Sequence, residues 1–211
     1  MQTTPHRFQP HDLVAGHLAL DLVNTVTARD SQPCDWLASY AALLEWAGLT
    51  GRFDGRALAQ LDRLAGERPA AARAALARCR RLREALHAVV DALRRQRAAP
   101  AAALSTLDTF RRATAGRGRL VAGGGQVALR FDPAHSSLDL VADVVLADAL
   151  ALLAEPPLDR LRQCDGAHCG WLFIDRSKAG RRRWCDMATC GAAHKAERFR
   201  QRQALGAGPA G

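Results

Sequence analysis

Residues 164–190 read CDGAHCGWLFIDRSKAGRRRWCDMATC, and this stretch decides how the chain is organised. It holds two cysteine pairs, Cys164 with Cys169 and Cys185 with Cys190, each with four residues between its members. Fifteen residues separate the two pairs, and a glycine follows each pair, as a tight turn around a metal requires. Structural zinc sites are built from such paired thiolates in a tetrahedron. We therefore expect one structural Zn²⁺ per chain, held by Cys164, Cys169, Cys185 and Cys190.

Two other uses of these cysteines remain open, namely two disulfides or four ordinary thiols. The N-terminal residues lack the basic start, apolar centre and cleavage site of a secretory signal, so we expect the protein in the cytoplasm, where disulfides are disfavoured. His168 and His194 lie beside the cysteines and could each replace one as a ligand, although four cysteines already complete the site.

Positive charge is concentrated around the second cysteine pair. The chain has a formal net charge of +9, and residues 176–202 contribute +7 of it through nine basic and two acidic side chains. A local basic cluster of this kind favours a polyanionic partner, nucleic acid before others.

The basic side chains fall into two groups. Three consecutive arginines precede Cys185, and we expect them on DNA phosphates because their side chains diverge. A helix after Cys190 is expected to carry Lys195, Arg198 and Arg202 on one face, widened by Arg200, with Arg198 and Arg202 nearer the bases. The alternative is a solvated face without a partner. The expected nucleic-acid contacts are Arg181, Arg182, Arg183, Lys195, Arg198, Arg200 and Arg202.

The first 156 residues predict a helical domain. Apolar residues at helical spacing indicate helices at 16–28, 35–48, 70–97 and 101–114, and Asp54 is placed to cap another at 57–64. Residues 119–122 and 126–131 flank three glycines and predict a β-hairpin. Ser137 is expected to cap an apolar helix that runs to Ala154 and is ended by Pro156 and Pro157.

The expected fold is therefore mainly α with a small β-hairpin, a helical domain followed by a structural zinc finger. We place the helical domain at 1–156, the finger at 157–204 and a flexible tail at 205–211. Because we expect two domains joined at a proline-rich linker, Cys164→Ser or Cys185→Ser should unfold the finger and leave the N-terminal helices folded.

A small polar group stands out in the first helix. Asp21, Asn24 and Thr25 share one side of an otherwise apolar stretch, which indicates a buried polar network or, alternatively, the polar corner of a small-molecule effector site. The three glycines at 123–125 do not form a phosphate loop, because no Lys-Ser/Thr or helix start follows them. The histidines show no catalytic spacing, so we expect a protein that is not an enzyme.

Several segments of the sequence resemble a known family. CGWLFIDRSK at 169–178, RRWCDM at 182–187 and CG at 190–191, with Lys195, Arg200 and Arg202 downstream, resemble the CGNR-type zinc finger, and LALDLVNT at 18–25 resembles the opening helix of the ABATE domain that precedes it. The resemblance spans about 16–203 and implies a bacterial stress-induced transcription regulator. One departure is that Ala192 and Ala193 stand where the family motif has Asn and Arg.

These observations together predict a zinc-dependent DNA-binding transcription regulator, cytoplasmic and associated with the nucleoid. Its helical domain would sense an effector or mediate association, for example as a homodimer. The alternative is a zinc-finger module that binds protein or RNA without reading DNA sequence. No membrane partner is expected, because no run of about 18 uncharged apolar residues occurs.

Overall fold

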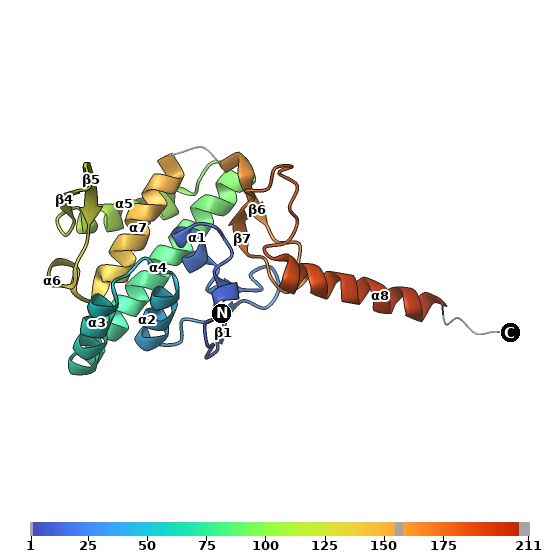
Figure 1. Ribbon diagram of the computed structural model, residues 1–211, viewed down its shortest axis with the longest axis horizontal. Coiled ribbons are helices and arrows are strands. Elements are labelled where there is room, and N and C mark those ends of the chain that lie inside the picture. The colour runs from blue at the N-terminus through green and yellow to red at the C-terminus, as the bar shows by residue number, and fades with distance from the viewer. Residues whose placement is uncertain (1, 155–157, 207–211) are drawn as a thin grey trace.

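The computed structural model describes residues 2–154 and 158–206 and is mainly helical, which confirms the expected fold class (Figure 1). The α-helices are α1 (Leu18–Val23), α2 (Tyr40–Leu49), α3 (Gly55–Glu67), α4 (Pro69–Arg94), α5 (Ala101–Ala115), α6 (Pro133–Ser136), α7 (Leu140–Ala154) and α8 (Ala192–Gly206). Short 3-10 turns lie at η1 (Pro10–Asp12), η2 (Ser137–Asp139) and η3 (Leu158–Arg160), and a π-helical turn lies at η4 (Met187–Gly191). Among the described residues, no helix is long and apolar enough to cross a membrane.

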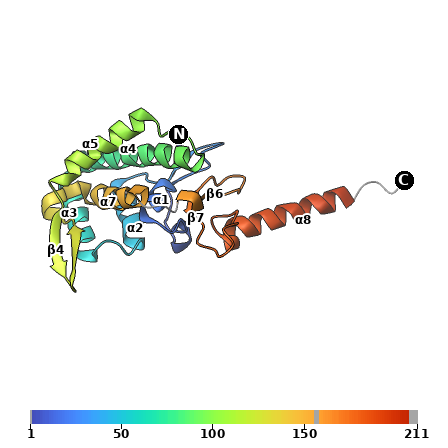
Figure 2. The ribbon, with the colours of Figure 1, turned by 90° about the horizontal axis from the view of Figure 1, so that it is seen from above.

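Helix α4 runs through the helical body, with α5 along one side and α1 and α7 along another (Figure 2). Its predicted stripe is confirmed: Leu82, Leu86 and Val89 are buried in the common core, and Leu93 packs against it. The bounds predicted for α3, α4 and α5 agree with the structure to within about three residues, and Asp54 caps α3 by accepting a hydrogen bond from the Ala57 amide at 3.3 Å.

Helix α7 is apolar on almost every side because it is buried on almost every side. Its carboxylates need partners there. Asp143 accepts hydrogen bonds from Thr114 at 2.7 Å and from the Arg117 guanidinium, and Asp148 lies 2.8 Å from His17 Nδ1. These pairs satisfy charges that would otherwise be costly to bury.

Three predicted helix boundaries are wrong. The first helix ends at Val23, because the chain after Asn24 turns into a strand at Val26. The second begins at Tyr40 rather than 35, because Ser39 caps it and Asp35 lies in a strand. Ser137 does not cap the apolar helix: with φ of 49° it ends α6 and opens η2.

In the described part of the chain, the strands form three small sheets. The predicted hairpin is confirmed as β4 (Arg119–Gly123) paired with β5 (Gln126–Arg130). Sequence patterns did not predict the other two sheets. One has the order β1-β3-β2, formed by Gln2–Thr3, Cys34–Asp35 and Val26–Thr27, and the other pairs β6 (Leu161–Gln163) with β7 (Leu172–Ile174) in antiparallel register. These strands have only two or three residues, too few to show a period.

The C-terminal segment divides into a part packed on the helical body and a part that leaves it. Strand β7 lies against α1 and pairs with β6, whereas α8 projects from the body as a single helix (Figures 1 and 2). The stop expected at Pro156 and Pro157 lies outside the described residues. Of the expected flexible tail, residues 205 and 206 are the end of α8, and 207–211 lie outside the described residues.

Candidate metal centre and basic surface

The first cysteine pair sits at the tip of the β6–β7 hairpin. The amide of Cys164 donates to the Trp171 carbonyl at 2.8 Å, and the amide of Cys169 donates to the Gly166 carbonyl at 3.0 Å. The amide of Gly166 also points at Cys164 Sγ, 3.4 Å away. Gly170 adopts a φ of 70°, which a side chain would strain, and so closes the turn. This turn brings Cys164 and Cys169 to one side of the hairpin.

The second pair is placed by the π-helical turn η4. Cys185 is buried just before it, and Cys190 lies within it. Asp186 caps the turn, since its side chain accepts a hydrogen bond from the Thr189 amide at 2.9 Å. Backbone pairing joins the two halves of the site, because the Asp165 amide donates to the Arg183 carbonyl at 3.0 Å. The chain continues from Cys190 directly into α8, so the metal site fixes the base of that helix.

The four cysteine sulfurs form a cluster that fits one zinc ion. All four Sγ atoms lie within 4.8 Å of one another. Cys169 Sγ lies 3.7 Å from Cys185 Sγ, and Cys185 Sγ lies 3.6 Å from Cys190 Sγ. A tetrahedral site with zinc–sulfur bonds of about 2.3 Å has sulfur–sulfur edges of about 3.8 Å. His168 and His194 are not part of this cluster, so the site is a four-cysteine site.

Electrostatics also favour a cation at the centre of the cluster. The neighbouring Cys164 and Cys169 thiols, together with burial, raise the pKa of Cys185 above its ordinary value. Burial likewise raises the pKa of Cys190. Four thiolates therefore cannot share this space unaided, whereas a divalent ion stabilises all four.

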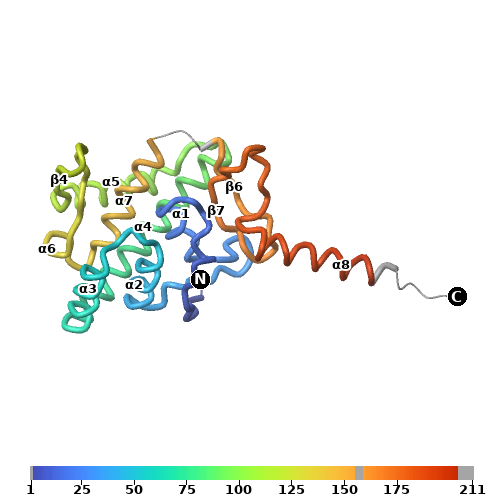
Figure 3. Tube along the Cα trace, in the orientation of Figure 1, coloured from blue at the N-terminus to red at the C-terminus, as the bar shows by residue number. Residues whose placement is uncertain are grey.

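The finger packs directly on the helical body, with hydrogen bonds and a common core between them. The Ala28 amide donates to the Cys169 carbonyl at 2.8 Å, and the Ile174 amide donates to the Ala15 carbonyl at 2.9 Å. The rings of Trp36 and Trp171 meet edge to face with centroids 5.5 Å apart. Trp171 and Phe173 of the finger belong to the same hydrophobic core as the helices. Figure 3 shows the blue N-terminal segment lying against the orange finger.

The polar residues of the first helix have separate roles. Asn24 and Thr25 are buried and hydrogen-bonded: Asn24 pairs with Leu172, and the Thr25 hydroxyl donates to the Leu22 carbonyl and accepts from Arg83. Asp21 does not join them. It accepts a hydrogen bond from the Ala15 amide at 3.0 Å and lines a cavity with His17 instead. Burial raises the pKa of Asp21 to about 7.

Asp175 organises the loop that leads to the arginine triplet, a role the sequence reasoning missed. The buried carboxylate accepts hydrogen bonds from the amides of Ser177 at 2.9 Å and Arg182 at 2.8 Å. Hydrogen bonding from Ser177 and from the Arg182 amide lowers the pKa of Asp175 to about 2. The spacing Asp-x-Ser is the signal that could have predicted the first of these bonds, because Asp side chains commonly bind the amide two residues on.

The arginine triplet is not uniform. The Arg182 guanidinium lies over the Phe173 ring, 4.6 Å from its centroid, and donates to the Trp184 carbonyl at 2.8 Å. Arg183 forms an exposed ion pair with Asp165 at 2.7 Å. Arg181 is exposed and forms no ion pair with the residues that the structure describes. Of the three arginines expected on phosphates, Arg182 therefore uses its guanidinium group for contacts within the finger.

Helix α8 presents two different faces. Ala193, Glu197 and Arg200 line a groove of about 670 Å³ beside the cysteine cluster. The expectation that Arg200 widens the other basic face is wrong, since Arg200 borders this groove and pairs with Glu197 at 2.5 Å.

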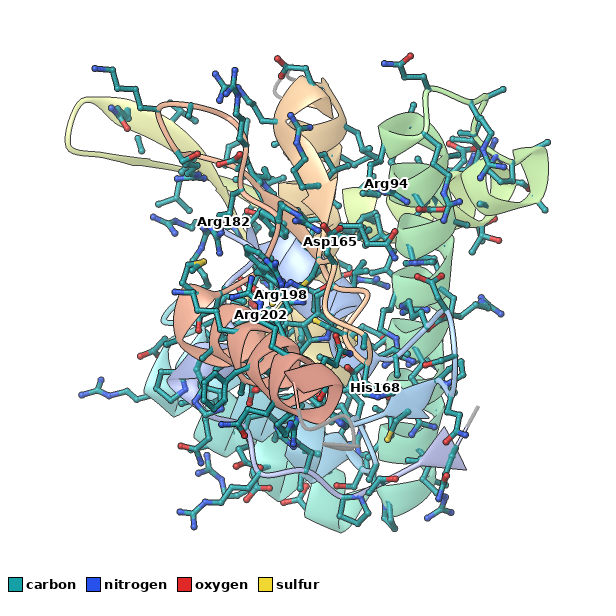
Figure 4. All side chains as sticks on the ribbon, turned by 90° about the vertical axis from the view of Figure 1, so that its right-hand side faces the viewer. Arg94, Asp165, His168, Arg182, Arg198 and Arg202 are labelled. Atoms are coloured by element: carbon teal, nitrogen blue, oxygen red, sulfur yellow. The ribbon has the colours of Figure 1, made fainter. Side chains whose placement is uncertain are left out.

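By helical periodicity, Lys195, Arg198 and Arg202 lie on the opposite, outward face. Figure 4 looks onto the end of α8 and shows Arg198 and Arg202 on one side of the helix and His168 on the other. None of the three cations of this outward face forms an ion pair within the described part of the chain. Phe199 lies beside them and is 62% exposed.

This geometry defines a class of protein: a helical domain that carries a four-cysteine zinc finger on its C-terminal side. Residues 16–156 match the ABATE family, described as "Putative stress-induced transcription regulator", and residues 160–203 match the CGNR zinc finger. The chain therefore belongs to the ABATE family and ends in a CGNR zinc finger. Both are regulator or zinc-finger families rather than enzyme families. A search of curated proteins finds no match.

Proposed function

We propose that this protein is a zinc-dependent, DNA-binding transcription regulator that is not an enzyme, and that α8 is its recognition helix. The observation that supports this proposal is the outward face of α8, which carries Lys195, Arg198 and Arg202 without carboxylate partners in the described residues. The family description, which names a transcription regulator, agrees with this role.

The shape of α8 suits a DNA groove. Helix α8 projects from the body, and the major groove of B-DNA accepts an α-helix. Three like charges on one face repel each other unless an anion is present, so a phosphate backbone stabilises this arrangement. Arg181, four residues before Cys185, is exposed and would add a phosphate contact.

Zinc supports this role indirectly. Held by Cys164, Cys169, Cys185 and Cys190, it would supply structural cross-linking between the β6–β7 hairpin and η4. Because Cys190 is followed at once by α8, these ligands would set the direction in which the helix leaves the body. Asp186 and the Asp165–Arg183 backbone bond hold the same junction.

The test is fluorescence anisotropy of the zinc-loaded full chain on duplex DNA over a salt series. Arg198→Ala and Arg202→Ala should each weaken binding. A lost phosphate contact lowers the slope of log affinity against log salt by about 0.9, whereas a lost base contact flattens the sequence preference. Arg200→Ala is the matched control, since Arg200 lies on the groove side, paired with Glu197, and it should change neither slope nor preference.

The opposite result would favour a different function. If Arg198→Ala combined with Arg202→Ala binds DNA as wild type does, with zinc content unchanged, α8 does not contact DNA. The protein would then be a module for binding protein or RNA without DNA sequence specificity.

Other features belong to the same proposal. We take 1–156 and 157–204 as the two functional segments, with the helical domain sensing an effector or mediating a homodimer. A DNA regulator of this kind would act in the bacterial cytoplasm, at the nucleoid. Sedimentation of the zinc-loaded chain with and without DNA measures the oligomeric state.

A further inference from the structure

A cleft of about 450 Å³ lies where the finger meets the helical body. The body contributes His17 and the end of α7, and the finger contributes Arg160 and the loop after β7. This volume falls in the usual range for small-molecule sites. The lining residues are His17, Ala151, Leu152, Arg160, Ile174, Asp175, Arg176, Ser177 and Lys178.

Three cations of this cleft lack a carboxylate partner. Arg160 donates to the Ser177 carbonyl at 3.2 Å, and Arg176 donates to the Gly16 carbonyl at 2.8 Å. Neither they nor Lys178 forms an ion pair with any carboxylate in the parts of the chain that the structure describes. These carbonyl contacts fix the guanidinium groups while leaving most of their N–H donors unused.

The carboxylate of Asp175, which lines the cleft, and that of Asp148, which binds His17, are already engaged. Both oxygens of Asp175 accept backbone hydrogen bonds, from Ser177 and Arg182. Asp148, behind the cleft, is held by His17 at 2.8 Å and by the Ala19 amide at 3.2 Å, and lies 3.3 Å from Arg52. The cleft therefore presents an excess of positive charge that the described residues do not neutralise.

One wall of the cleft is apolar. Leu152 and Ile174 are largely buried and present only their edges to the cleft, and the exposed Ala151 lies beside them. A bare inorganic ion would leave this wall in water, whereas an organic anion would cover it.

We propose that this cleft binds a small organic phosphate, with Arg160, Arg176 and Lys178 around the phosphate group and the organic part against Leu152 and Ile174. Guanidinium groups suit phosphate because their planar donors form charge-assisted, bidentate hydrogen bonds.

The position of the cleft gives the ligand a route to α8. The loop 176–178 is joined through Asp175 to the Arg182 amide, and Arg182 contacts Phe173 and Trp184 next to Cys185. A ligand that orders this loop would favour one arrangement of the finger. The ligand would then be the effector that the helical domain senses. That regulatory consequence rests on the proposed DNA-binding function, whereas the binding site itself does not.

The test is calorimetric titration of the zinc-loaded full chain with phenyl phosphate at fixed ionic strength, in the absence of DNA. Saturable binding of one molecule per chain is expected, with weaker binding of inorganic phosphate because the apolar wall stays uncovered. Arg160→Gln, Arg176→Gln and Lys178→Gln should each weaken phenyl phosphate binding about tenfold, the effect of losing one charge-assisted contact. Arg63→Gln removes the same charge from the exposed surface of α3 and should leave the affinity unchanged.

Three results would overturn the proposal. One is that the wild type shows no saturable binding. A second is an equal loss of affinity in Arg63→Gln, which would indicate general charge attraction. The third is found in a separate titration with duplex DNA: Arg176→Gln and Lys178→Gln lower the salt slope of DNA binding while duplex DNA displaces phenyl phosphate, which makes the cleft a contact for DNA phosphates. Unchanged zinc content and circular dichroism of each variant exclude misfolding. Because the titration contains no DNA, failure of the DNA-binding proposal leaves its result interpretable.

Discussion

The side-chain amide of Asn24 pairs with both backbone groups of Leu172, donating from Nδ2 to the carbonyl at 2.9 Å and accepting at Oδ1 from the amide at 2.9 Å. Asn24 follows the last residue of α1, and Leu172 begins β7 in the finger. The amide thus occupies the position of a neighbouring strand and satisfies the free edge of β7 beside a buried helix. This contact makes the finger and the helical body one packed unit.

Asn24→Ala should destabilise the whole protein. It leaves the buried N–H and C=O groups of Leu172 without partners, at a cost of about 1–3 kcal/mol for each group. Urea denaturation of the zinc-loaded protein measures the free energy of unfolding. Asp30→Ala is the control, because Asp30 makes an exposed hydrogen bond to Gln163 across the same boundary. Similar small losses in both variants would show that the Asn24 pairing contributes little.

Zinc removal should affect more than the finger. The linker at 155–157 led us to expect that Cys185→Ser leaves the N-terminal helices folded, but the shared core changes that expectation. Trp171, Leu172 and Phe173 pack with the helices, so releasing the cysteines would expose the face of α1 that they cover.

Hydrogen exchange measures this directly. After chelation, or in Cys185→Ser, amides of α1 and β2 should lose protection together with β7, while α3, which is remote from the finger, keeps its own. Loss of protection confined to 158–206 would restore the view of two independent domains.

Much of the fold could be predicted because long helices carry their own signal. The stripe of Leu82, Leu86 and Val89 marks α4, and the glycines at 123–125 mark the β4–β5 hairpin. The boundaries failed where tertiary contacts override local preference. Helix α1 ends before Asn24 because the side-chain amide of Asn24 is hydrogen-bonded to the backbone of Leu172. Asp35 joins a strand because it pairs with the buried Arg83 at 2.7 Å.

The metal centre could also be predicted, because thiolate spacing is a local property of the sequence. The cationic cleft could not, since it combines His17 with Arg160 and Arg176 from segments more than 140 residues apart. The basic face of α8 was predicted in part. Periodicity placed Lys195, Arg198 and Arg202 together, but only the position of the groove shows which side Arg200 takes.

Asp21 should make stability depend on pH. Its folded pKa of about 7 lies above the ordinary value of 3.8, mainly because of burial, so the folded state binds the proton more tightly. The resulting stability is complete below about pH 4 and is lost as pH rises through 7.

Asp21→Asn keeps an oxygen for the Ala15 amide and removes the charge. It should raise the free energy of unfolding by about 4 kcal/mol at pH 8 and by less than half as much at pH 5, because a shift from 3.8 to about 7, at about 1.4 kcal/mol for each pKa unit, is fully expressed only above the folded pKa. Denaturation at the two pH values compares the variants. A uniform change at both would mean that Asp21 does not titrate in this range.

Phe199 should read a base if α8 enters the major groove. The ring is 62% exposed between Arg198 and Arg200, so Phe199→Ala should change the free energy of folding by no more than about 0.5 kcal/mol. An apolar side chain on a recognition helix contacts the methyl group of thymine. On duplexes selected by the wild-type protein, Phe199→Ala should therefore weaken binding about threefold to tenfold, corresponding to roughly 1 kcal/mol. The salt slope should stay the same, because the ring touches no phosphate.

Replacing each thymine in turn by deoxyuridine removes only its methyl group. One such replacement should weaken binding of the wild type and of Phe199→Leu, but have no further effect on Phe199→Ala. If every deoxyuridine duplex binds the wild type and Phe199→Ala in the same ratio as the thymine duplex does, Phe199 does not contact a thymine methyl group.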